Sequence, residues 1–183
     1  NSISVIAASQ TNSGNGRAMM NLPAFYSKKL AFGPDVVRAI EKGMEPLSLE
    51  APLEKTLALV ADALGKRVPE LVVMTMNRPR HENLIREIRR AGSALRLISD
   101  GDITAAVSPS MPDSGVDIYF GIGGSPEGIL TAAALKALGG GMLLQMWPKD
   151  DAEKAQILNE VSAEELQRVF GVDDLVSGES AIF

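Results

Sequence analysis

The fold is decided between Leu71 and Leu138, where three segments share one pattern: LVVMTMNRPRH at 71–81, LRLISDGD at 95–102 and VDIYFGIGGSPEG at 116–128. Each segment is an apolar, strand-like run that ends in a short polar loop, and each loop opens a stretch with helical periodicity. Strands that alternate with helices predict an α/β fold, with a mostly parallel sheet and helices on both faces. The loops that follow parallel strands emerge at one edge of such a sheet, where these folds bind their ligands.

The composition is that of an ordinary globular protein. Of 183 residues, 45% are hydrophobic and 22% are charged, and the absence of cysteine excludes disulfides and zinc–thiolate sites. The net charge of −5 argues against a nucleic-acid partner, and no basic run indicates a membrane surface. No apolar run is long enough to cross a bilayer and we recognise no signal peptide, so we expect a cytoplasmic protein.

The rest of the chain adds further elements to this pattern. We expect strands at 2–8, 70–76, 95–98, 116–120 and 142–146, and a hairpin-type turn at 11–17. The segment 21–32 fits no single pattern and ends at the breaker Gly33-Pro34, which we interpret as a possible domain boundary. Helices are expected at 36–42, 52–64, 81–91, 103–107, 126–138, 149–159 and 163–170, followed by a loop and a last strand within 172–183.

The first polar loop offers two arginines. Arg78 and Arg80 flank Pro79, whose ring fixes the backbone and could hold both guanidinium groups toward one site. Arginine donates in a planar fork that matches phosphate oxygens, although two solvated arginines at a helix start remain an equal alternative. The only histidine, His81, follows them, and we expect it to cap or pack rather than to act in chemistry.

The second and third loops supply carboxylates and glycines. In Asp100-Gly101-Asp102 the glycine allows a sharp turn, and the two acids could accept hydrogen bonds from sugar hydroxyls or simply cap the next helix. The segment Gly121–Gly128 resembles a phosphate cradle that leads into a helix, with Ser125 as its N-cap. Glu127 in the first turn could ligate a metal or could only complement the helix dipole.

Taken together, these loops resemble the class II fructose-1,6-bisphosphatase family of bacteria. The resemblance is carried by Arg78–His81, by Ile98–Asp102, and by Pro112–Asp117 followed by Gly121–Gly128. It extends to Pro23–Pro34, where the family has a tyrosine in a setting similar to that of Tyr26, and it is weak beyond Gly140. The order and spacing of all three loops make the resemblance specific.

The resemblance implies a fold, a reaction and a set of site residues. The family has the layered α/β sandwich of sugar and inositol phosphatases and removes the 1-phosphate of fructose 1,6-bisphosphate in gluconeogenesis, using Mn²⁺ or Mg²⁺. Some members also hydrolyse sedoheptulose 1,7-bisphosphate. Glu127 would be a metal ligand, and the residues that would line the sugar bisphosphate are Tyr26, Arg78, Pro79, Arg80, Asp100, Gly101, Asp102 and Gly124.

The resemblance also implies that part of the site is missing. The family's other metal carboxylates, and hence its catalytic residues, lie upstream of the position that corresponds to Asn1. We therefore expect an internal fragment, incomplete at both ends and inactive by itself. Residues 1–33 would be the trailing part of a metal-supplying domain, and residues 34–183 would be an α/β domain that binds the sugar phosphate.

Two other functions stay open on the sequence alone. A sugar-phosphate-binding or isomerase-type domain would use the same glycines and arginines without hydrolysis, and a purely structural part of a larger assembly would need none of them. Under the leading hypothesis the partner is a sugar bisphosphate, with no nucleic acid and no membrane. We also expect a homo-oligomer.

Overall fold

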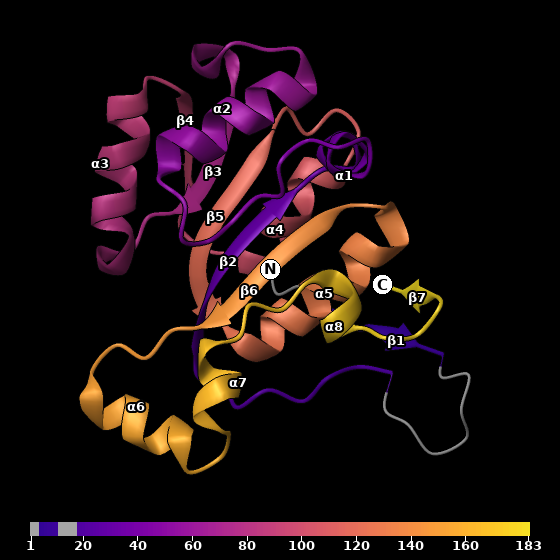
Figure 1. Ribbon diagram of the computed structural model, residues 1–183, viewed down its shortest axis with the longest axis vertical. Coiled ribbons are helices and arrows are strands. Elements are labelled where there is room, and N and C mark those ends of the chain that lie inside the picture. The colour runs from indigo at the N-terminus through magenta and orange to yellow at the C-terminus, as the bar shows by residue number, and fades with distance from the viewer. Residues whose placement is uncertain (1–3, 11–17) are drawn as a thin grey trace.

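A five-stranded mixed sheet forms the centre of the molecule (Figure 1). The computed structural model describes residues 4–10 and 18–183. The strand order is β4-β3-β5-β2-β6, and a small separate sheet pairs β1 with β7. The bounds of the strands are β1 Ala8–Ser9, β2 Tyr26–Phe32, β3 Val72–Met76, β4 Ala94–Ile98, β5 Ile118–Gly124, β6 Gly141–Met146 and β7 Ala181–Ile182.

Four of the five strands run in the same direction. β3 pairs in parallel with both β4 and β5, whereas β2 pairs in antiparallel fashion with β5 on one side and β6 on the other. The carboxyl ends of β3, β4 and β5 therefore meet at one edge, as the repeated pattern predicts.

Helices cover both faces of this sheet, which confirms the expected α/β architecture (Figure 1). On one face, side chains of α1, α2 and α3 pack against apolar residues such as Leu30 and Val73. On the other face, α4, α5 and α8 pack against residues that include Ala31 and Met74. The helices are α1 Pro34–Glu41, α2 Leu53–Leu64, α3 Glu82–Ala91, α4 Asp102–Val107, α5 Ser125–Leu138, α6 Asp151–Leu158, α7 Ala163–Gln167 and α8 Val172–Leu175.

A third, smaller core lies beyond the end of β6. There α6 and α7 contribute Ile157 and Leu166, which cluster with Met146 at the end of β6. Figure 1 shows both helices past the same edge of the sheet at which β5 and β6 end. Within the described residues, no helix has the length and apolar character needed to cross a membrane.

The largest difference from expectation is β2, where the sequence alone had left 21–32 without an assignment. Its two adjacent lysines obscure the alternation of a strand, yet Tyr26–Phe32 pairs with β5 and Ser27–Phe32 pairs with β6. Because β2 lies between two strands that follow Gly33 in the chain, the expected boundary at Gly33-Pro34 does not separate the strands of this sheet.

Two further expectations concern the start of the chain. The strand expected at 2–8 is wrong for residues 4–7, which form no strand, and only Ala8–Ser9 pairs, with Ala181–Ile182. β1 and β7 pair over only two residues each, so the alternating residues before Ala8 have no partner strand to pair with. The turn expected at 11–17 lies outside the described residues.

Candidate functional site

The site is built around the last three residues of β5, Ile122–Gly124. Arg80 donates from Nε to the carbonyl oxygen of the first residue at 2.7 Å. The carboxylate of Asp102 lies where a Cβ on the second residue would be, and that of Glu127 lies where a Cβ on the third would be. Side chains that follow three different strands, β3, β4 and β5, therefore converge on one strand end, as expected from the topology.

Arg80 is held between β5 and β2. Its guanidinium carbon lies 4.7 Å from the centre of the Tyr26 ring, a cation–π geometry, while Nε is bonded to Ile122. The terminal nitrogens of Arg80 have no ion-pair partner within the described part of the chain. The guanidinium group of Arg80 is thus fixed in position, and its terminal N–H groups can still donate to an anion.

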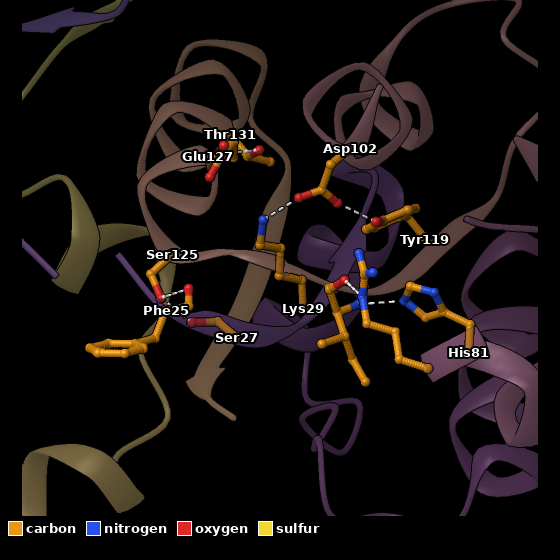
Figure 2. Close-up of polar contacts among 11 residues, drawn as sticks. Phe25, Ser27, Lys29, His81, Asp102, Tyr119, Ser125, Glu127 and Thr131 are labelled. Atoms are coloured by element: carbon orange, nitrogen blue, oxygen red, sulfur yellow. Dashed lines mark hydrogen bonds and ion pairs between the residues drawn. The ribbon is translucent and has the colours of Figure 1, made fainter. Parts of the chain in front are cut away.

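His81 contacts Ile122, the same residue of β5 to which Arg80 donates. It is fully buried, and its Nε2 accepts a hydrogen bond from the backbone N–H of Ile122 at 2.7 Å (Figure 2). Burial, reinforced by the positive charge of Arg80, lowers the pKa of His81 to about 4. His81 is therefore neutral near pH 7 and packs inside the protein, which confirms the expected packing role.

Asp102 faces the interior on the side of the sheet covered by α4 and α5. One carboxylate oxygen accepts from Nζ of Lys29, and the other accepts from the phenol of Tyr119 (Figure 2). Lys29 and Tyr119 are both almost completely buried. Burial and the negative charge of Asp102 together raise the pKa of the Tyr119 hydroxyl, so Tyr119 stays a neutral donor.

Arg78 and Asp100 form an ion pair on the outer rim of the site. Nη2 of Arg78 lies 2.5 Å from Oδ1 of Asp100, and the Asp100 side chain is 82% exposed. Arg78 thus contacts the loop after β4, whereas Arg80 contacts the end of β5. Pro79 between them is exposed at the start of a short 3₁₀ turn, Pro79–His81.

The turn between the two aspartates has the expected geometry but a different cap. Gly101 adopts a left-handed conformation with φ +96°, so a glycine is required there. It is also the N-cap of α4, and Asp102 is the first helical residue. The alternative that Asp100 or Asp102 caps this helix is therefore wrong, and the carboxylate of Asp102 is instead engaged by the interior donors.

The glycine-rich segment is a strand rather than a loop. Gly121–Gly124 pairs residue by residue with the start of β2, and α5 begins directly at Ser125, so Gly124 rather than Ser125 is the N-cap. Ser125 is buried and donates to the carbonyl oxygen of Phe25 at 3.0 Å. The prediction of a phosphate-binding loop is thus wrong, because this segment has the backbone of a strand. Its glycines leave room for the neighbouring side chains that pack against the strand.

Comparison with known proteins decides the family. The family model of bacterial fructose-1,6-bisphosphatase, glpX-encoded, matches residues 1–183. The chain belongs to this family.

Individual relatives agree with this membership. The chain is 36% identical to the fructose-1,6-bisphosphatase class 2 of Haemophilus influenzae over 194 residues, which cover 100% of the chain and 55% of that relative. It is 37% identical to the D-fructose 1,6-bisphosphatase class 2/sedoheptulose 1,7-bisphosphatase of Microcystis aeruginosa, over 88% of the chain and 48% of that protein. The corresponding Synechocystis protein is 34% identical over the same shares. The chain spans about half the length of these relatives.

For a member of this bisphosphatase family, the described residues do not make a metal site by themselves. Glu127 is exposed and borders a cavity of about 400 Å³ together with Tyr26, Gly124, Lys149 and Glu153. No group of three or more His, Cys, Asp or Glu side chains that could hold a metal ion occurs among residues 4–10 and 18–183. Hard divalent cations take about six oxygen ligands, so one exposed carboxylate does not suffice.

Sequence reasoning missed Lys29 and Tyr119. Both are polar groups that β2 and β5 carry into the interior, and their common partner Asp102 is 73 and 17 residues away from them in the chain. One signal was present for Lys29. In a strand, the adjacent residues Lys28 and Lys29 must point to opposite faces, so one of the two had to be buried among helices.

Proposed function

We propose that this chain provides the sugar-bisphosphate-binding part of a class II fructose-1,6-bisphosphatase, which hydrolyses the 1-phosphate of fructose 1,6-bisphosphate. The observation that carries the proposal is the convergence of Arg80, Asp102 and Glu127 on Ile122–Gly124. The match to the family over residues 1–183 supports the choice of substrate class.

In this proposal the site residues divide into anion-binding and positioning groups. Arg78 and Arg80 bind a phosphate, because their guanidinium groups are reachable at the rim and are held by Asp100 and Tyr26. Asp100 accepts from sugar hydroxyls at the exposed edge. Pro79 fixes the backbone between the two arginines, and Gly101 and Gly124 carry no side chain that would block the sugar phosphate. Asp102 holds its loop in place through its two buried donors.

Glu127 is proposed as one ligand of the family's divalent metal, Mn²⁺ or Mg²⁺. Because the described residues include no cluster of three or more side chains that could hold a metal, further carboxylates would have to come from the part of the relatives' length that this chain does not span. We therefore propose that the chain by itself binds the sugar bisphosphate without hydrolysing it.

A second candidate is a sugar-phosphate-binding role with no hydrolysis in any context. It is favoured by the same observation, since the described residues carry groups that bind an anion and a sugar but no cluster that holds a metal. The two candidates differ in metal dependence, because only the phosphatase requires Mn²⁺ or Mg²⁺ for turnover.

Titration of fructose 1,6-bisphosphate into the protein, by calorimetry with and without Mn²⁺, tests the proposal. We expect the wild-type protein to bind fructose 1,6-bisphosphate both with and without Mn²⁺. The affinity of Arg78→Ala should be at least about tenfold weaker, because a charge-assisted contact is lost. Arg86→Ala is the matched control, because Arg86 is exposed on α3 and bonds only to Asn83 within the described residues. Unchanged affinity in Arg78→Ala would show that Arg78 does not bind the sugar bisphosphate. Release of phosphate in the presence of Mn²⁺ would disprove the proposal that the chain is inactive by itself.

A further inference from the structure

A second cavity lies on the sheet face opposite Asp102. Its volume is about 390 Å³, within the range of small-molecule sites. The walls come from β2 and β5, from the start of α2 with the loop before it, and from α3. It shares Arg80 and Ile122 with the proposed sugar-bisphosphate site. The residues that carry the argument are Lys28, Leu49, Thr56, Arg80, Glu87 and Phe120.

The cavity carries two cations that lack an anionic partner. Lys28 and Arg80 both border it, and neither forms an ion pair within the part of the chain that the structure describes. Glu87 is the one acid in the lining, so the walls carry a net positive charge. Unpaired, half-buried cations at a concave surface favour an anionic ligand.

The same wall carries further hydrogen-bonding groups. Thr56 is only 1% exposed as a residue and borders the cavity, where its hydroxyl is a donor for a bound anion. In addition, α2 begins at Leu53 on this wall with no side-chain cap on its first N–H groups, which are donors suited to an anion.

The remaining wall is apolar. Lys28 is paired with Ile122 and Leu30 with Phe120, so all four project to this face of the sheet, and Leu49 approaches from the loop before α2. An anion small enough to contact Lys28 alone would leave this apolar surface uncovered. A ligand that suits the whole cavity therefore has a charged head and an apolar body.

We propose that this cavity binds a phosphomonoester with an apolar or aromatic body. The phosphate contacts Lys28, Thr56 and the first N–H groups of α2, and the body packs against Phe120 and Leu49. The site is separate from the one that binds the sugar bisphosphate, and it adjoins that site at Arg80. This inference goes beyond the proposed phosphatase function and does not depend on it.

Titration with phenyl phosphate, followed by calorimetry and by amide chemical shifts, tests the proposal. We expect saturable binding with shifts at residues of the cavity, weakened at least about tenfold in Lys28→Gln and in Thr56→Val. Lys42→Gln removes the same charge from an exposed lysine outside the cavity and is expected to leave the affinity unchanged. Inorganic phosphate, which has no apolar body, is expected to bind at least about tenfold more weakly than phenyl phosphate.

Competition distinguishes a separate phosphomonoester site from the proposed sugar-bisphosphate site. With saturating fructose 1,6-bisphosphate, phenyl phosphate is still expected to bind. Complete displacement, together with equal loss of both ligands in Lys28→Gln, would mean that the cavity belongs to the sugar-bisphosphate site and would overturn the inference. Wild-type affinity in both cavity variants would overturn it as well. If the sugar bisphosphate does not bind at all, the phenyl phosphate titrations keep their meaning.

Discussion

Asp100 and Asp102 are two residues apart, yet they lie in opposite environments. The side chain of Asp100 is 82% exposed and pairs with the half-exposed Arg78, whereas that of Asp102 is 12% exposed and pairs with the fully buried Lys29. Gly101 between them adopts a left-handed conformation and is the N-cap of α4. One short motif therefore supplies both an exposed contact at the rim and an anchor in the interior.

The difference shows how one loop can be both accessible and rigid. An exposed ion pair costs little to separate, so under the proposed function Arg78 and Asp100 can leave each other to contact the sugar bisphosphate. A buried carboxylate bonded to a buried ammonium and a buried phenol cannot be exchanged in this way, because each group would be left uncompensated. Under the proposed function, the interior contacts of Asp102 fix the position from which Asp100 contacts the sugar.

The largest effect is expected from Asp102→Ala. This change leaves the buried ammonium of Lys29 without a partner, and it should lower the free energy of unfolding by about 3–5 kcal/mol. Chemical denaturation measures the loss.

A double variant sharpens this prediction. Asp102→Ala combined with Lys29→Met removes both charges and should recover most of the lost stability, because two apolar groups can replace a buried ion pair. If the stability losses of the two single substitutions simply add in the double variant, Lys29 and Asp102 are not coupled. The interior pair would then not differ from the exposed Arg78–Asp100 pair.

An intermediate effect is expected from pH, through His81 on the interior side of the site. Its pKa is lowered to about 4 in the folded protein, against an ordinary value of 6.5. As the pH falls below 6.5 the unfolded chain takes up a proton that the folded protein does not. Stability should therefore decrease toward pH 4, by up to about 3 kcal/mol in total.

The control uses the fact that His81 is the only histidine. His81→Gln keeps an acceptor for the N–H of Ile122 but cannot titrate, so its stability should change less than that of the wild type between pH 6.5 and 5. Parallel pH profiles for the two proteins would show that His81 is not held neutral by the fold.

The sequence predicted the elements whose pattern is local. Strands β3, β4 and β6 and helices α2, α3 and α5 lie within two residues of their expected bounds, because each has a clear apolar run or period and all except β3 have a glycine or proline near a limit. The convergence of the three loops also followed from the sequence, since parallel strands end at one edge.

The remaining features depend on residues that are distant in the chain. β2 was not recognised, because Lys28 and Lys29 disguise a strand whose burial is decided by its neighbours β5 and β6. Gly121–Gly124 was read as a loop because glycine is uncommon in strands. Its glycines are needed for contact with Tyr119, Asp102 and Glu127, and no local pattern reveals those contacts.

The smallest effect is expected from Asp100→Ala, which makes the same chemical change as Asp102→Ala at the exposed position. Solvent screens the Arg78–Asp100 pair, so the free energy of unfolding should change by less than about 1 kcal/mol. The measurement is the same denaturation curve, with the Asp102→Ala protein beside it. A loss as large as that of Asp102→Ala would mean that the rim pair is part of the folded core, and the division between an exchangeable rim and a fixed interior would have to be abandoned.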